Sequence, residues 1–340
     1  MRRLAPKTLL ILLGGLLPLS LLCGLILGPQ IILPFELLSS GDSSVVSDRL
    51  IVEQIRLPRT LMAALVGAAL AVAGVMMQGL FRNPLADPSL IGVSSGASAG
   101  ASFVIVLGAG WLGSNDLLGV SLISLGAFAG AALATYIVYR LAAHSSGTSV
   151  ATMLLAGIAI SALAGALNSF FSFIADNHML RQISLWQMGS LSGVSWSRLG
   201  FAAAVFLPLL FLYPRYSGAL NALLLGESEA RHLGVDVHRL KVKVIALVAL
   251  TVGCAVALTG TIAFVGLVTP HIVRLLIGPD HRALIPAVCF AGAVLLMLAD
   301  ALSRFLLAPA ELPIGVVTAL LGAPFFLSLL KQQRRVGGAL

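Results

Sequence analysis

Charged residues are scarce in this chain, and their scarcity excludes most soluble folds. Only 10% of the 340 residues are Asp, Glu, Lys or Arg, whereas 59% are hydrophobic, and the mean hydropathy is +1.03. A composition this apolar is typical of a polytopic membrane protein. Because no segment between the apolar runs is long enough for a soluble domain of useful size, we expect a single transmembrane domain over residues 1–340.

The sequence also lacks several motifs that carry chemistry. No G-x-x-x-x-G-K-[ST] phosphate loop occurs, so the chain cannot hydrolyse ATP by that device and is not expected to be an enzyme. Cys23, Cys254 and Cys289 lie inside apolar runs without paired spacing, which predicts neither a disulfide framework nor a metal site. Ionisable residues are absent from the centres of these runs, which disfavours an intramembrane proton or sodium relay. Asp300 and Arg304 come closest, and their i,i+4 spacing fits either a mutual ion pair or a role in a pathway.

Apolar runs of about 20 residues, the length that crosses a bilayer as a helix, recur along the chain. They predict an all-α protein with about ten transmembrane helices. The expected spans are residues 9–27, 58–80, 90–109, 117–139, 150–174, 199–212, 242–262, 263–277, 284–306 and 314–330.

The net charge of +8 follows the expected topology and does not require a nucleic-acid partner. With the N-terminus in the cytoplasm, most of the 21 Lys and Arg residues lie in the inner connecting segments. This excess matches the positive-inside rule for an even number of spans with both termini in the cytoplasm. The outer segments hold only Arg49, Arg56, Arg59, Arg181, Arg198 and Arg304.

Residues 82–88 interrupt two apolar runs with the sequence RNPLADP, which cannot continue as a membrane-spanning helix. Irregular backbone at membrane depth must be buried in protein or line an aqueous path. The flanking residues 67–79 and 92–97 are rich in small side chains that let helices approach closely. This combination favours a conduit over an anchor. Met76, Met77 and Gln78 are candidates for the lining of a path, although core packing explains the methionines equally well.

The longest charged insertion between spans lies within residues 217–240, here called the coupling segment. Glu227 and Arg231 are spaced as an i,i+4 ion pair, and Gly226 and Gly234 lie at the two ends of the charged stretch. One or two short helices are therefore expected at the cytoplasmic surface. Because the stretch carries acidic residues, it favours a protein partner over the alternative, a helix resting on lipid.

Several motifs, taken together, resemble those of the FecCD-type permeases, the membrane subunits of bacterial ABC importers for iron-siderophores, heme and cobalamin. The resemblance covers nearly the whole chain in order and spacing. The motifs are RLPR at 56–59, QGLFRNPLADP at 78–88, LGE at 225–227, ARHLG at 230–234, FVGLVTPH at 264–271, LAD at 298–300 and AELPIGVVT at 310–318.

The resemblance implies a type II importer architecture in the bacterial inner membrane. It implies a homodimer, two cytoplasmic ATPase subunits that bind ATP and Mg, a periplasmic binding protein, and no cofactor on this chain. Asn83 and Leu85 match the family's cytoplasmic gate, and residues 144–149 correspond to a second constriction. The residues that the resemblance assigns to contact with the ATPase are Leu225, Gly226, Glu227, Glu229, Arg231, Leu233 and Gly234.

At the outer face, Arg56, Arg59 and Arg304 match family arginines that receive acidic residues of the binding protein. A guanidinium suits this role because its rigid fork fits a carboxylate, although arginines here can also reach lipid headgroups. Residues 185–196 are expected to form an amphipathic helix and turn at the same face. The resemblance is closest to heme importers, with ferric-siderophore and cobalamin permeases as alternatives. An ion-coupled secondary transporter is the alternative from another class.

Overall fold

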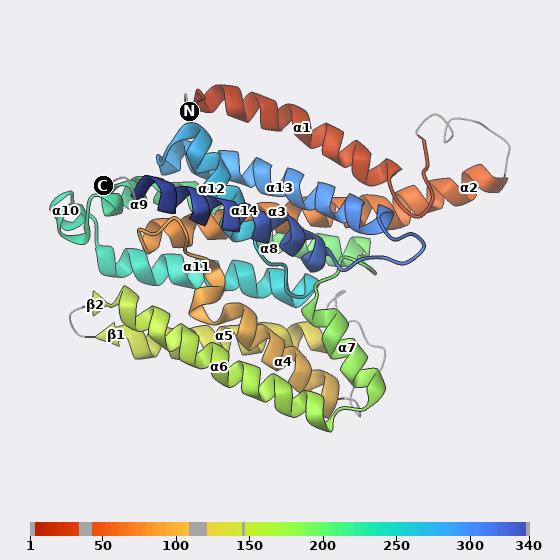
Figure 1. The fold of residues 1–340 in the computed structure, drawn as a ribbon, viewed down its shortest axis with the longest axis horizontal. Helices are drawn as coiled ribbons and strands as arrows, with labels where there is room; N and C mark the ends of the chain where they lie inside the picture. The colour runs from red at the N-terminus through yellow and green to blue at the C-terminus, as the bar shows by residue number, and fades with distance from the viewer. Residues whose placement is uncertain (1–3, 34–42, 109–120, 145–146, 338–340) are drawn as a thin grey trace.

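The structure is a computed structural model that describes residues 4–33, 43–108, 121–144 and 147–337. These residues form an elongated bundle of helices (Figure 1). The α-helices are α1 (Pro6–Ile26), α2 (Ser43–Leu50), α3 (Leu57–Leu80), α4 (Val93–Leu107), α5 (Leu122–Ala142), α6 (Val150–Ile174), α7 (Asn177–Gln187), α8 (Trp196–Leu212), α9 (Ser217–Leu224), α10 (Glu227–His232), α11 (Val237–Thr259), α12 (Val265–Ile277), α13 (His281–Phe305) and α14 (Ile314–Gly337). The remaining elements are the π-helical η2 (Ile51–Arg56), the 3-10 helices η3 (Pro88–Ile91) and η4 (Tyr213–Tyr216), and a hairpin of β1 (Ala143–His144) and β2 (Gly147–Thr148).

The apolar helices coincide with the expected spans. Among the described residues, seven helical segments are long and apolar enough to cross a membrane, and three shorter apolar helices accompany them. The all-α membrane architecture is thus confirmed, while the number of crossings stays a prediction. The long segments are Pro6–Ile26, Val45–Leu80, Leu122–Ala142, Val150–Ile174, Trp196–Leu224, Val237–Thr259 and His281–Phe305, and the shorter ones are Val93–Leu107, Val265–Ile277 and Ile314–Ser328.

Local capping explains where the helix boundaries depart from the apolar runs. Helix α11 begins before the expected residue 242 because the Asp236 carboxylate accepts a hydrogen bond of 2.9 Å from the Arg239 backbone N–H. The amphipathic helix in this region is α7, which lies earlier than the expected 185–196. It begins after Asp176, whose carboxylate caps it, and residues 188–195 are turns instead.

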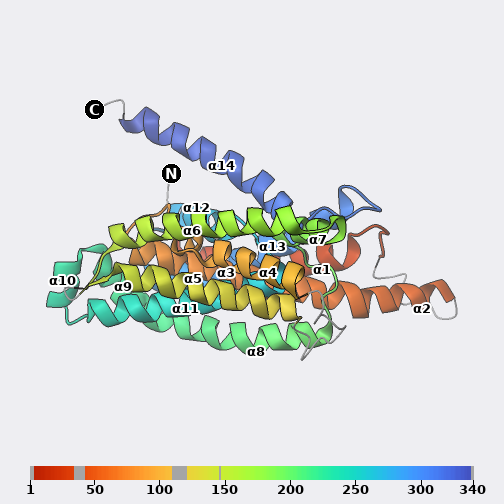
Figure 2. The same cartoon turned by 90° about the horizontal axis from the view of Figure 1, so that it is seen from below.

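Helix α3 lies at the centre of the bundle, and nearly all of its residues are buried. It packs against α13, α12, α11 and α8. Small residues allow this close approach, as the flanking sequence predicted: a methyl group on Gly67 would overlap the carbonyl oxygen of Gly292, and one on Gly74 would overlap that of Gly266. In Figure 2, α6 lies on one side of α3 and α4, while α5, α11 and α8 lie on the other.

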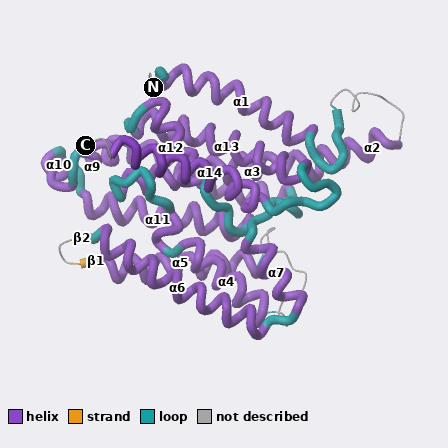
Figure 3. Tube along the Cα trace, in the orientation of Figure 1, coloured by secondary structure: helices purple, strands orange, loops and turns teal. Residues whose placement is uncertain are grey.

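The two ends of the bundle carry different elements. One end holds α9, α10, the β1–β2 hairpin, the start of α1 and the end of α14, and the other holds α2 and α7 (Figure 1). Helix accounts for most of the trace, and the longer loops lie mainly toward the ends (Figure 3). At the α7 end, three segments are joined through the backbone: Ser190 N–H donates to Thr259 over 2.7 Å, and Gly315 N–H donates to Met188 over 3.1 Å.

Candidate functional site

The segment between α3 and η3 is non-helical, as its two prolines predicted. We call residues 81–88 the gate loop. Arg82 turns the chain with a positive φ of 51°, a value that is uncommon outside glycine. The Asn83 side-chain oxygen then accepts a hydrogen bond of 2.9 Å from the Leu85 backbone N–H. Asn83 is exposed and Leu85 is partly exposed. Both expected gate residues therefore lie at the surface of this subunit, and their role in a gate stays a prediction.

The end of the gate loop is fixed more firmly than its start. Asp87 caps η3 by accepting a hydrogen bond of 2.8 Å from the Ser89 N–H. Gly92 follows in the left-handed region with φ of 77° and connects η3 to α4. Gly157 of α6 packs directly on the Leu90 carbonyl, where a larger side chain would collide. Helix α6 and the backbone that follows the loop are therefore in close contact.

Two neighbours contact the other half of the gate loop. The His271 ring of α12 lies close to the Pro84 backbone. The Arg82 guanidinium approaches the coupling segment closely enough that a Cβ atom built on Gly226 would lie 3.9 Å from Nη1. The loop is therefore in contact with a buried helix on one side and with the coupling segment on the other.

The coupling segment forms two short helices, α9 and α10, as predicted, and α10 lies at the extreme end of the molecule (Figure 1). Its apolar side chains are not all buried. Ala230 is inaccessible, whereas Leu225 is 68% and Leu233 is 63% exposed. Gly226 and Gly234 adopt positive φ values of 126° and 83°, which glycine tolerates and which turn the chain around α10. Two leucines are thus presented outward at this end of the bundle.

The ion pair expected between Glu227 and Arg231 is present, but a second and closer pair joins Glu227 to Lys241. Glu227 Oε1 lies 2.7 Å from Nζ of Lys241, whose side chain is only 4% exposed. The Arg231 guanidinium is 3.9 Å from Glu227 on an exposed surface, too far for a hydrogen bond. The principal task of Glu227 is therefore to bind α10 to the start of α11. Glu229 and Arg231 remain exposed.

Asn221 joins α9 to the start of α13. Its Nδ2 donates a hydrogen bond of 2.6 Å to Asp280, and its Oδ1 accepts one of 2.9 Å from the His281 N–H. A hydrogen bond from the Arg282 backbone and the one from Asn221 lower the pKa of Asp280. The carboxylate therefore stays ionised at neutral pH and holds this junction together.

Met76, Met77 and Gln78 lie inside the subunit. The two methionines are fully buried, and Gln78 is 1% exposed. The Gln78 amide reaches the Leu267 carbonyl of α12 over 3.4 Å, a long contact. In this conformation the three side chains pack between helices of one subunit, which is the core-packing alternative. Their place in a translocation path stays a prediction.

The three arginines assigned to docking are also buried at the α2 end. Arg56, Arg59 and Arg304 are only 3–5% exposed. Arg56 donates to the carbonyls of Leu25 and Ile26 over 2.7 and 2.8 Å and so fastens α1 to η2. The snorkelling alternative does not describe these side chains, because they point into the protein.

Asp300 is the centre of a buried charge cluster formed with Arg59, Arg304 and Glu311. Its side chain is inaccessible, and its carboxylate lies 2.9 Å from Arg59 Nε and 3.1 Å from Arg304 Nη2. The predicted mutual pairing of Asp300 and Arg304 is therefore present. Glu311 contacts Arg59 Nη1 over 2.8 Å and is 36% exposed. A carboxylate arriving from outside would have to replace Glu311 to reach Arg59.

The expected second constriction at residues 144–149 falls in the β1–β2 hairpin. Residues 145 and 146 lie outside the described residues. The backbone pairs Ala143 with Thr148 and His144 with Gly147. The hairpin lies at the same end as α10 (Figure 1).

Sequence reasoning missed three residues that organise these regions: Lys241, His271 and Glu311. Each contacts a residue outside its own helix or loop: Lys241 is 14 residues from Glu227, and Glu311 is 252 residues from Arg59. The sequence feature that could have identified them was their position, either inside the family-like motifs or beside the start of a helix. Among the described residues, no group of three or more His, Cys, Asp or Glu side chains is arranged to hold a metal ion.

Comparison with known proteins places this geometry in one family. The model of the FecCD transport family matches residues 16–332. The hemin transport system permease protein HmuU of Yersinia pestis is 48% identical over 280 residues, covering 82% of this chain and 83% of that protein. The vitamin B12 import system permease protein BtuC of Escherichia coli O9:H4 (strain HS) is 44% identical over 326 residues, covering 96% and 95%.

Solved structures agree with the sequence comparisons. A metal-chelate type ABC transporter in an inward-facing conformation superposes with a TM-score of 0.84 at 34% identity, covering 96% of this chain and 99% of the other. PsaBC from Streptococcus pneumoniae shares the fold, with a TM-score of 0.56 at 20% identity. From the matched motifs, the interrupted α3–α4 connection and these relatives, the chain belongs to the FecCD transport family and is the permease subunit of an ABC importer.

Proposed function

We propose that this permease moves heme from a periplasmic binding protein to the cytoplasm by alternating access. The observation that carries the proposal is the 48% identity to a hemin permease, against 44% for the vitamin B12 permease. The cobalamin relative matches over a longer part of the chain, so cobalamin is the second candidate and a ferric siderophore the third. Family membership removes the ion-coupled secondary transporter from consideration.

The proposed assembly is a homodimer in the inner membrane with two ATPase subunits. One side of the bundle supports it: α6 presents Leu155, Ile158, Leu163 and Phe173, each more than half exposed. Helix η3, which follows the gate loop, contacts α6 at Gly157. The gate loop itself lies beside His271 of α12. A second copy placed against this side would bring two gate loops together across a two-fold axis.

The end that carries α10 is the proposed cytoplasmic end, with both termini on that side. Exposed Leu225 and Leu233 offer an apolar contact, and Glu229 and Arg231 offer a polar rim, which is the usual anatomy of a protein interface. ATP and Mg are then bound by the partner subunit. The periplasmic binding protein docks at the opposite end, where Glu311 is the accessible member of the buried charge cluster.

Transport in proteoliposomes tests the substrate. The permease is reconstituted with its ATPase and its cognate binding protein, and heme, a ferric siderophore and cobalamin are supplied singly and in competition. We expect ATP-dependent uptake of heme, with weak competition from the other two. Uptake of cobalamin that excess heme does not reduce would assign the chain to the second candidate instead.

A further inference from the structure

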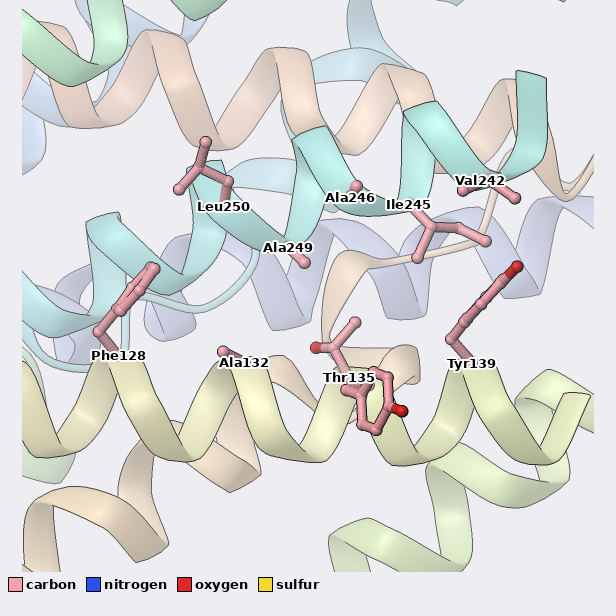
Figure 4. A pocket seen from close by; sticks show the side chains of 10 residues that line it. Phe128, Ala132, Thr135, Tyr139, Val242, Ile245, Ala246, Ala249 and Leu250 are labelled. Atoms are coloured by element: carbon pink, nitrogen blue, oxygen red, sulfur yellow. The ribbon is translucent and has the colours of Figure 1, made fainter. Parts of the chain in front are cut away.

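An apolar groove of about 290 Å³ runs between α5 and α11 (Figure 4). Phe128 and Ala132 line it from α5, and Ala246, Ala249 and Leu250 line it from α11. Its volume is close to the lower end of ligand sites in proteins, about 300 Å³. Helix α5 packs against both α6 and α11, and in Figure 2 α11 lies on the side of the bundle away from α6, so the α11 wall of the groove is turned away from the proposed dimer side.

One polar atom in this groove lacks a partner. Thr135 is 5% exposed, and its hydroxyl forms no hydrogen bond with any described residue. A threonine in a helix commonly donates to the carbonyl of the preceding turn, so an unpaired buried hydroxyl is unusual. Figure 4 shows the Thr135 side chain among the groove residues. The site therefore offers a hydrogen-bond donor within an apolar wall.

The end of the groove nearest α10 has a basic rim. Arg140 follows Tyr136 by one turn of α5, is exposed, and places its Cζ 6.0 Å from the centroid of the Tyr136 ring. Arg239 precedes Val242 by one turn of α11 and is also exposed, with Asp236 at 3.0 Å. Tyr136 and Val242 line the groove, so both arginines continue its two walls. They bring positive charge to the level where phospholipid headgroups lie.

We propose that this groove binds an anionic phospholipid of the cytoplasmic leaflet. The phosphate lies between Arg140 and Arg239, whose guanidinium groups donate paired hydrogen bonds to it. One acyl chain occupies the wall formed by Ala132, Ala246 and Ala249. The Thr135 hydroxyl donates to the ester carbonyl of the lipid. Thr135 lies five residues before Arg140, or about 7.5 Å along the helix, so it is placed deeper in the membrane than the phosphate. This proposal does not depend on which substrate the permease carries.

Native mass spectrometry of the purified permease in mild detergent tests the site. Delipidated protein is titrated with phosphatidylglycerol and with phosphatidylcholine of the same acyl chains. We expect tighter binding of phosphatidylglycerol. The double variant Arg140→Gln, Arg239→Gln should weaken that binding by roughly thirtyfold, since a basic residue near the surface contributes about a factor of five. Ala246→Phe, which fills the groove, should abolish it, and Thr135→Val should weaken it.

Matched controls separate the groove from the rest of the surface. Ala204→Phe changes an exposed alanine of α8, and Arg215→Gln changes an exposed arginine after that helix, so both should bind phosphatidylglycerol like the unchanged protein. Equal binding of the two lipids, or full binding by the Arg140→Gln, Arg239→Gln variant, would overturn the proposal. A disulfide between two copies through Ala132→Cys, in a chain without its native cysteines, would assign the groove to a second subunit and overturn it too.

Discussion

At the scale of single residues, the buried charge cluster around Asp300 sets the stability of the α2 end. Asp300 neutralises two guanidinium groups that are otherwise enclosed by α1, α3 and α13. Removing one partner of a buried ion pair leaves an uncompensated charge and is strongly destabilising, by about 3–5 kcal/mol. We therefore expect Asp300→Asn to lower the unfolding temperature of the detergent-solubilised subunit markedly, as measured by tryptophan fluorescence.

The control for this change is Glu53→Gln. Glu53 pairs with Arg49 over 2.8 Å, but both side chains are at least half exposed, and exposed pairs contribute little to stability. The unfolding temperature should therefore stay close to that of the unchanged subunit. Equal effects from the two substitutions would show that burial of the cluster does not govern stability.

At the scale of elements, the coupling segment contains one residue that holds the fold together and two residues that are exposed to a possible partner. Glu227 contacts the buried Lys241, so its substitution would disturb the fold as well as any partner. Leu225 and Leu233 are exposed and offer a cleaner test. Because burial of a leucine contributes about 1.5–3 kcal/mol, Leu225→Ser with Leu233→Ser should weaken association with the ATPase at least tenfold. Co-purification and surface plasmon resonance measure this association.

Leu185→Ser provides the matched control, since Leu185 is 49% exposed on α7 at the opposite end of the bundle. This variant should bind the ATPase normally. If the Leu225→Ser, Leu233→Ser variant binds the ATPase as well as the unchanged protein, the contact with the ATPase does not lie at α10.

At the scale of the whole molecule, the gate loop predicts a contact between two subunits. In a chain without native cysteines, Leu85→Cys should form a disulfide across the dimer in one access state and lose it in another. Asn83→Cys should behave in the same way. Nucleotide and binding protein select the states, and non-reducing electrophoresis measures the cross-link. Free labelling of both positions without a cross-link in any state would remove this loop from the gate.

The sequence predicted elements better than it predicted contacts. Apolar length located the spans, and residues 150–174 coincide with α6. Prolines 84 and 88 identified the interruption. Spacing along one helix predicted the pair of Glu227 with Arg231, which is present, whereas the closer pair of Glu227 with Lys241 depends on how two helices meet. The buried state of Arg59 was equally hidden, because its partners Asp300 and Glu311 come from a distant part of the chain.

The central position of α3 has a consequence for biosynthesis. Helix α3 is made early, yet α13, which packs on Gly67 through Gly292, is synthesised more than 200 residues later. The partner of Arg59, Asp300, is 241 residues downstream. The nascent helix must therefore enter the bilayer with its future core facing lipid or the insertion machinery, and Arg59 lacks its partner Asp300 until α13 is made. Helix α3 can complete its packing only after α13 has been synthesised. The order in which the helices are made therefore differs from the order in which they pack.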